Sequence, residues 1–325
     1  MLQLWKEIES MRKIALSLTL LATSLACLLL AVPAQAQAIR VFVSLTGADS
    51  NPCTFASPCK SAQHAHDVVA AGGELRMLDP GSYGLLTITK AISILGDGHG
   101  GIAAQSGATA ITINAGANDK VNLRGLVIEG FGTGATGIMF NTGASLHIQD
   151  SAVRNFANVG IYFRPTAASR LNVSQTVVSD GGNTAFAIII QPSGSGSANA
   201  VLDHVELDYG ATGLQLIGDL TTGTIDVSIA DSVISNIFAG DGIAAQSGPG
   251  GGVTHLMVRN CKVSNNSRGI AAFGTAAIVR VTKSTITANT TGWGAFNSAT
   301  LYSYNDNNVD GNTTDGSPTS NIGFN

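Results

Sequence analysis

The sequence repeats at an interval that suits one turn of a coil of short strands. In each repeat a small residue is followed by a short alternation of apolar and variable residues. Eight such segments begin at Ala110, Gly137, Gly160, Ala187, Gly213, Gly242, Gly269 and Gly292. Successive segments start 23 to 29 residues apart, whereas a propeller blade needs about 40–45 residues. Leu and Asn are also missing from the fixed offsets that a leucine-rich repeat requires.

Each repeat contains a second apolar pattern. Two apolar residues enclose one variable residue, and an aliphatic residue follows after four more, as in Leu146, Ile148 and Val153. Alternation with period two is typical of strands that bury one face. The pattern therefore predicts about three short strands per repeat and an all-β solenoid, in which each turn contacts only its neighbours.

Polar residues recur at the predicted turns. Two columns of asparagines follow the third strand, and they comprise Asn155, Asn236, Asn265, Asn266, Asn289 and Asn312. Asparagine tolerates left-handed backbone, and stacked amides can hydrogen-bond along the coil axis. A further column holds small residues at a tight corner earlier in each repeat. It comprises Ser151, Thr176, Ser232, Cys261 and Ser284. Cys261 is therefore interpreted as a small buried residue and not as a nucleophile.

Residues 1–38 are predicted to be an N-terminal extension followed by a secretory signal peptide. Two basic residues precede the apolar segment Ile14–Val32, and small-x-small cleavage options end at Ala36 and Ala38. The apolar segment is also about long enough to remain as a membrane anchor. A lipoprotein modified at Cys27 is a further alternative.

Removal of residues 1–38 leaves an acidic chain with no predicted membrane span. The segment holds three of the 17 basic and two of the 21 acidic residues, so 14 face 19 and the net charge is −5. This charge disfavours nucleic acid as a partner. In an oxidising compartment, Cys53 and Cys59 are expected to form a disulfide.

The chain resembles the right-handed parallel β-helix proteins of the pectate-lyase-like superfamily. The resemblance combines the repeats with N-terminal segments at residues 41–52, 57–61, 73–83 and 92–96. It implies one continuous domain over 39–325, with an N-terminal capping module and first turns at 39–109 and repeats with a tail at 110–325. A short helix near Ser61–Ala71 is expected to cap the solenoid, with Ala62, Ala65 and Val69 on one face. Activity does not follow, because this fold hosts lyases, hydrolases, epimerases and adhesins.

Catalytic candidates are few. Lyases of this fold use a basic residue beside acidic groups that hold Ca²⁺, and hydrolases use paired carboxylates. Asp203 and His204 resemble a fragment of pectate lyases, and Glu206 and Asp208 alternate beside them. Because Asp203 and His204 fall in a turn column, a structural turn is the favoured interpretation. His99 lies in a glycine-rich turn and receives the same interpretation.

A column of outward residues follows the first strand of each repeat and is the candidate binding surface. It includes amides, an arginine and aromatics, and a second column runs beside it. The candidates are Asn141, Tyr162, Arg164, Gln191, Gln246, Phe273 and Phe296. Such side chains can hydrogen-bond sugar hydroxyls and stack on sugar rings, but they can also simply stabilise a solenoid face. Asp180 or Asp241 could reach this face from neighbouring loops.

These patterns favour a secreted or periplasmic, non-catalytic protein that binds a polysaccharide or a cell-surface glycan. A divergent polysaccharide lyase or glycoside hydrolase is the first alternative, and a structural or adhesive module is the second. No metal site or cofactor is expected, and Ca²⁺ enters only with the lyase alternative.

Overall fold

The computed structural model describes residues 1–29 and 37–323, which fall into two compact units. The first unit, Met1–Gln37, contains helix α1 (Leu2–Leu29), and the second unit is Ala38–Asn325. The predicted cleavage position at Ala36 lies outside the described residues, whereas Ala38 begins strand β1. In the part of the chain that the structure describes, no helix has both the length and the apolar character needed to cross a membrane.

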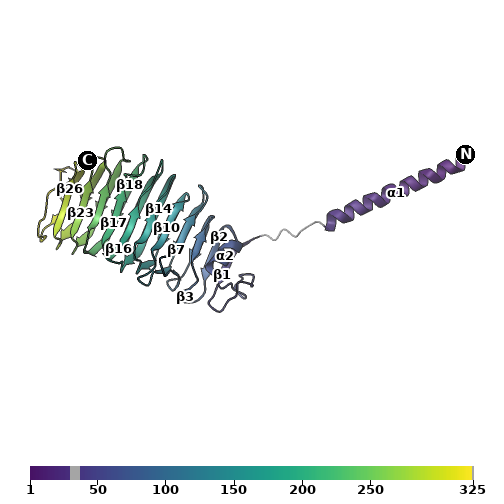
Figure 1. Ribbon diagram of the computed structural model, residues 1–325, viewed down its shortest axis with the longest axis horizontal. Coiled ribbons are helices and arrows are strands. Elements are labelled where there is room, and N and C mark those ends of the chain that lie inside the picture. The colour runs from purple at the N-terminus through teal and green to yellow at the C-terminus, as the bar shows by residue number, and fades with distance from the viewer. Residues whose placement is uncertain (30–36, 324–325) are drawn as a thin grey trace. The chain divides into compact units, whose positions relative to one another are not determined.

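The second unit is a right-handed parallel β-helix, as predicted. Figure 1 shows its strands stacked side by side along the unit, from β2 to β26. One face of the coil is a nine-stranded sheet, in which every neighbouring pair is parallel. Its strands are β4 (Leu86–Ile88), β7 (Thr109–Asn114), β10 (Thr136–Thr142), β13 (Val159–Phe163), β15 (Phe186–Ile190), β17 (Thr212–Ile217), β20 (Asp241–Gln246), β23 (Arg268–Phe273) and β26 (Thr291–Phe296).

A twenty-stranded sheet supplies the other two faces as two rows of strands. The first row is β1 (Ala38–Val43), β2 (Val69–Met77), β5 (Ile92–Leu95), β8 (Lys120–Arg124), β11 (Ser145–Gln149), β14 (Ala168–Ser179), β16 (Ser197–Gly210), β18 (Ile225–Ala230), β21 (Thr254–Arg259), β24 (Ala277–Thr282), β27 (Thr300–Ser303) and β29 (Ser320–Asn321). The second row is β3 (Gly81–Ser82), β6 (Gly100–Ala103), β9 (Val127–Glu129), β12 (Ala152–Arg154), β19 (Val233–Ile237), β22 (Lys262–Ser264), β25 (Thr285–Thr287) and β28 (Asn308–Val309). Strands β14 and β16 bend and belong to both rows. The prediction of three strands per repeat is therefore confirmed.

The core is built from aligned columns of apolar residues. One column from the nine-stranded sheet is Ile111, Ile138, Ile161, Ile188, Leu214, Ile243, Ile270 and Trp293. All of these side chains are buried. Each fully buried aliphatic side chain contributes roughly 1.5–3 kcal/mol, so the repeats stabilise one another through these columns.

The turn columns have the backbone geometry that the asparagines predicted. Asn155, Asn236 and Asn265 have φ of 60°, 58° and 59°, in the left-handed region. Tyr209 occupies the same column at φ 55°, which is a strained conformation for a bulky residue. His204 lies in the turn between the two rows of strands and has φ 51°. This left-handed backbone agrees with its interpretation as a turn residue.

Buried asparagines form a ladder along the axis, as predicted. The backbone N–H of Asn266 donates to the side-chain Oδ1 of Asn289 at 3.0 Å. The backbone N–H of Asn289 donates to the side-chain Oδ1 of Asn312 at 2.9 Å. The Asn312 N–H in turn donates to Asp315 Oδ1 at 3.2 Å. Asn266 and Asn289 are only 4% and 2% exposed, so these amides satisfy backbone groups that water cannot reach.

The N-terminal module contains the predicted helix and disulfide. Helix α2 (Ala62–Val68) is capped by Ser61, whose hydroxyl accepts from the His64 N–H at 3.2 Å. The helix is shorter than the predicted range 61–71, because Val69 begins β2, where its side chain is fully buried. Cys53 and Cys59 are disulfide-bonded, which confirms their predicted pairing.

Candidate functional site

The seven predicted binding residues lie along the nine-stranded sheet, from the turn of β10 to that of β26, and the turn of β17 between them carries none. Gln246, Phe273 and Phe296 are aligned in register across β20, β23 and β26. Asn141 lies in β10 and Tyr162 in β13, and Arg164 and Gln191 directly follow β13 and β15. Neighbouring turns are about 4.8 Å apart. The structure thus brings the predicted residues onto one outer surface, which we call the ladder face.

In the N-terminal half of the ladder face, the polar side chains bond to one another. Asn141 Nδ2 donates to Asn114 Oδ1 at 2.8 Å, across one turn of the coil. The Tyr162 hydroxyl donates to Gln191 Oε1. The Arg164 guanidinium carbon lies 5.4 Å from the centre of the Tyr162 ring. These contacts hold the side chains in fixed positions and leave the exposed Arg164 guanidinium available to solvent.

The C-terminal half of the ladder face carries an aromatic pair and an ion pair. The Phe273 and Phe296 rings stack with centroids 5.1 Å apart, and Phe296 is 38% exposed. The Arg268 guanidinium carbon lies 5.1 and 5.3 Å from the two ring centres. Arg268 Nε donates to a carboxylate oxygen of Asp241, which is 7% exposed. Asp241 therefore lies beside the face, but an arginine balances its charge.

A hollow of about 410 Å³ adjoins the aromatic pair. It is lined by Asp219, Gln246, Gly248, Pro249, Phe273, Gly274, Thr275 and Asn297. The Asp219 carboxylate accepts from Gln246 Nε2 at 2.7 Å and from the Gly248 N–H at 2.6 Å. These two bonds tie neighbouring loops together and position the Gln246 amide at the edge of the hollow. Amide and carboxylate groups thus lie next to an apolar surface, a combination typical of ligand sites.

Sequence reasoning missed Asp219, Arg268 and Asn297. Asp219 lies in the loop after β17, whose length varies from repeat to repeat, so no column pointed to it. Arg268 and Asp241 precede Gly269 and Gly242, the small residues that mark their repeats. Comparing the residue before each small residue would have found this pair as opposite charges in adjacent turns.

The candidate catalytic residues lie on a different part of the coil. His204 Nδ1 and Asp203 Oδ2 are 2.9 Å apart, and both are near Asp231, with potential ligand atoms within 4.8 Å of one another. Glu206 follows the bend in β16 and is outside this cluster. The hydrogen bond that the His204 imidazole donates to the Asp203 carboxylate raises the pKa of this exposed imidazole above its ordinary value.

Other contacts show that this cluster is part of a turn. Asp231 accepts from Arg259 Nη2 at 3.3 Å and from Asn260 Nδ2, so its carboxylate already has two donors. The Arg259 guanidinium also opposes a cation at the same carboxylate. Asp208, which alternates with Glu206 in the sequence, accepts from Ser235 Oγ at 2.8 Å and from Asn236 Nδ2 at 2.6 Å, so it is also engaged within its own part of the coil.

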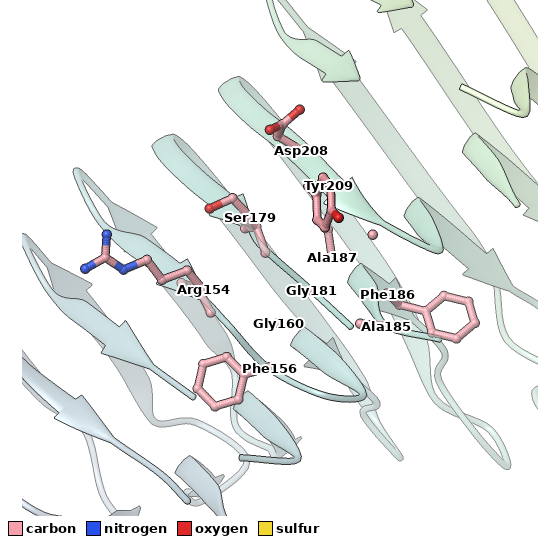
Figure 2. Close-up of a pocket in the computed structure, with 13 residues that line it drawn as sticks. Arg154, Phe156, Gly160, Ser179, Gly181, Ala185, Phe186, Ala187, Asp208 and Tyr209 are labelled. Carbon is pink, nitrogen blue, oxygen red and sulfur yellow. The ribbon is translucent and has the colours of Figure 1, made fainter. Parts of the chain in front are cut away.

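A small cavity lies beneath the turn that carries Asp208 and Tyr209. Figure 2 shows that its lining residues come from several neighbouring turns of the coil, with Arg154, Ser179 and Asp208 on adjacent strands. The cavity volume of about 10 Å³ holds one water molecule at most. It is therefore a packing void and not a ligand site.

The group formed by Cys53, Cys59 and His64 does not offer a zinc site. Cys53, Cys59 and His64 have potential ligand atoms within 4.8 Å of one another. Because the two sulfurs are joined, neither is a thiolate that could bind zinc. Cys261 is 3% exposed, and burial raises the pKa of its thiol to about 11, in agreement with its predicted structural role.

Comparisons with known proteins agree with the fold. No family model matches the sequence, and no curated protein is a detectable relative. Among solved structures, pectate lyase Pel9A superposes with a TM-score of 0.59 at 13% identity, covering 88% of this chain and 78% of that protein. Pectin methylesterase PemA from Erwinia chrysanthemi gives 0.46 at 14% identity, over 81% and 88%. The likeness to Pel9A shows the parallel β-helix fold.

Proposed function

We propose that the protein binds a polysaccharide or a cell-surface glycan on its ladder face without cleaving it. The observation that carries this proposal is the adjacency of the Phe273–Phe296 pair and the hollow beside Asp219 and Gln246. The hollow offers hydrogen-bonding groups for sugar hydroxyls, and the ring edges offer an apolar surface. A pectate lyase shares the fold, which supports a polysaccharide as the ligand class.

The carboxylates near the ladder face support a role without catalysis. A glycoside hydrolase needs one carboxylic acid that can give up a proton and a second carboxylate nearby. Asp241 is paired with Arg268, and Asp219 accepts two short hydrogen bonds. Both carboxylates are therefore already held by donors of the protein, which suits a positioning role.

Secretion or a periplasmic location is part of the proposal. The Cys53–Cys59 disulfide suits an oxidising compartment. Residues 1–38 have the basic and apolar segments of a secretory signal. Detection of the processed chain outside the cytoplasm, beginning near Ala38 by N-terminal sequencing, would test this part.

The binding proposal is tested with residues 38–325 on a broad glycan array, followed by calorimetry on each glycan that binds. We expect Phe273→Ala with Phe296→Ala to weaken binding about tenfold, which corresponds to about 1.4 kcal/mol. Phe131→Ala is the matched control, because it removes a 57% exposed aromatic ring from a distant turn. Absence of binding on the whole array, or equal losses in both variants, would refute the proposal.

A divergent lyase is the second candidate, and the Asp203–His204–Asp231 cluster is the observation that favours it. If this cluster binds Ca²⁺, calorimetric titration will show heat above dilution, and Asp231→Ala will abolish it. A titration with only dilution heat would remove the candidate.

A further inference from the structure

A second groove runs along a different face of the coil from the ladder face. It follows the outer surface of the first row of the twenty-stranded sheet, from β8 to β24. Two hollows of about 540 and 290 Å³ form it, and they adjoin at Asn199 and Asp226, which line both. We call this surface the row-one groove.

Two cations without acidic partners face the first hollow. Lys120 and Arg170 are aligned on either side of Ser145 in the strand register, so they are two turns apart, about 9.6 Å. Both are exposed and line the larger hollow. Within residues 37–323, neither side chain has an ion pair or a hydrogen bond to another group. By contrast, the nearby Arg124 and Arg154 are paired with Asp150 and Glu129.

The only acidic residue that lines the row-one groove is already engaged. Among the described residues, Asp226 is this acid, and its Oδ1 lies 2.8 Å from His255 Nδ1. Arg280 adds a further cation in the second hollow. Three cations therefore face one acid along this groove, on a chain whose formal net charge is −4.

We propose that the row-one groove binds an extended polyanion, namely the carboxylate or sulfate groups of an acidic polysaccharide. A linear polymer that lies parallel to the coil axis would meet Lys120, Arg170 and Arg280 in turn. The Asn199 amide and the Thr224 hydroxyl, which also line the groove, could hydrogen-bond sugar hydroxyls between the charges. Among the described residues, no Phe, Tyr or Trp lines either hollow, and the only rings there are the imidazoles of His147 and His255, so recognition here depends on charge more than on ring stacking.

This site is independent of the proposed function, because it uses a different face and a different chemistry. Exposed charge pairs are weak individually and are screened by salt. Binding is therefore expected to weaken steeply between low and physiological ionic strength. Loss of two of the three cations should weaken binding roughly tenfold at low salt.

The test measures binding of residues 38–325 to four immobilised polymers: polygalacturonate, dextran sulfate, neutral dextran and an oligothymidylate. The variant is Lys120→Gln with Arg170→Gln. The control, Lys60→Gln with Lys262→Gln, removes the same charge from two exposed lysines outside the groove. Binding to polygalacturonate or dextran sulfate identifies which anionic group is preferred, and neutral dextran should not bind.

Four outcomes separate the possibilities. A roughly tenfold loss in the groove variant, with less than a twofold loss in the control, supports the site. Equal losses in both variants, no binding to either acidic polysaccharide, or equally tight binding of oligothymidylate would overturn it. The loss caused by Lys120→Gln with Arg170→Gln should be the same when Phe273 and Phe296 are also replaced by Ala, so failure of the ladder-face proposal would not be mistaken for failure of this one.

Discussion

Asn289→Ala should destabilise the solenoid strongly, although it removes only one small polar side chain. Asn289 is 2% exposed, and its Oδ1 is the acceptor for the Asn266 N–H. Its Nδ2 lies 2.8–3.1 Å from three acceptors, the carbonyls of Val263 and Thr287 and Asn312 Oδ1, and shares its two hydrogens among them. Alanine cannot replace any of these bonds, and the space around the side chain is closed to bulk water.

The expected loss follows from the groups left without partners. A buried donor or acceptor without a partner costs about 1–3 kcal/mol. The Asn266 N–H loses its acceptor, and at least one carbonyl loses a donor. We therefore expect the free energy of unfolding to fall by about 2–5 kcal/mol. Asn199→Ala, on an exposed strand position with no side-chain hydrogen bond among the described residues, should change it by less than about 0.5 kcal/mol.

The assay is unfolding in guanidinium chloride, followed by circular dichroism, for the wild type and both variants. The comparison requires similar m-values, because a changed m-value would mean that the turns no longer unfold together. Amide hydrogen exchange at Asn266 gives a local readout and should accelerate in Asn289→Ala. A midpoint within error of the wild type, with unchanged exchange at Asn266, would show that the ladder does not stabilise the coil.

Three further predictions concern other contacts. Because Asp203 stabilises protonated His204, the NMR-measured imidazole pKa should exceed 6.5 and fall towards it in Asp203→Asn; any stabilisation from this pair is complete below pH 6.5 and lost above the raised pKa. Burial alone would raise the Asp49 pKa, but three hydrogen bonds from Lys60 and Ser61 outweigh it and lower the pKa, so in urea unfolding Asp49→Asn should destabilise the protein at pH 7 and much less once the pH falls below the lowered pKa. Replacing Cys53 and Cys59 by Ser should lower the thermal midpoint, and an unchanged midpoint would contradict a stabilising disulfide.

The strand register could be predicted because the same physical requirement recurs in every turn. Each inward position needs an apolar side chain, and each left-handed turn favours Asn or Gly, so the columns are visible in the sequence. Asn266 and Asn289 illustrate this, since their spacing alone indicated an amide ladder. The alignment of Gln246, Phe273 and Phe296 followed from the same register.

The contacts between side chains could not be predicted in the same way. Asp219 reaches Gln246 and Gly248 from an inserted loop, whose conformation the repeat does not determine. Strand register alone did not show that the Tyr162 hydroxyl would bond to Gln191, because rotamers decide which neighbours meet. Helix α2 ended earlier than expected because burial of Val69 in β2 outweighed the helical pattern.

The row-one groove was also outside the reach of the repeat pattern. Lys120 and Arg170 occur in different repeats, and each resembles an ordinary exposed residue in the sequence. Only the three-dimensional arrangement shows that they share a hollow and that neither has an acidic partner among the described residues.

Binding and cleavage of a polysaccharide can be separated in one experiment. Residues 38–325 are incubated with pectin, polygalacturonate and alginate, with and without Ca²⁺, while unsaturated ends, reducing ends and bound protein are followed together. We predict that protein is retained on at least one polymer and that no new chain ends appear. Formation of chain ends by the wild type, and its loss in Asp203→Ala or His204→Ala, would show that the protein is an enzyme and would contradict this account.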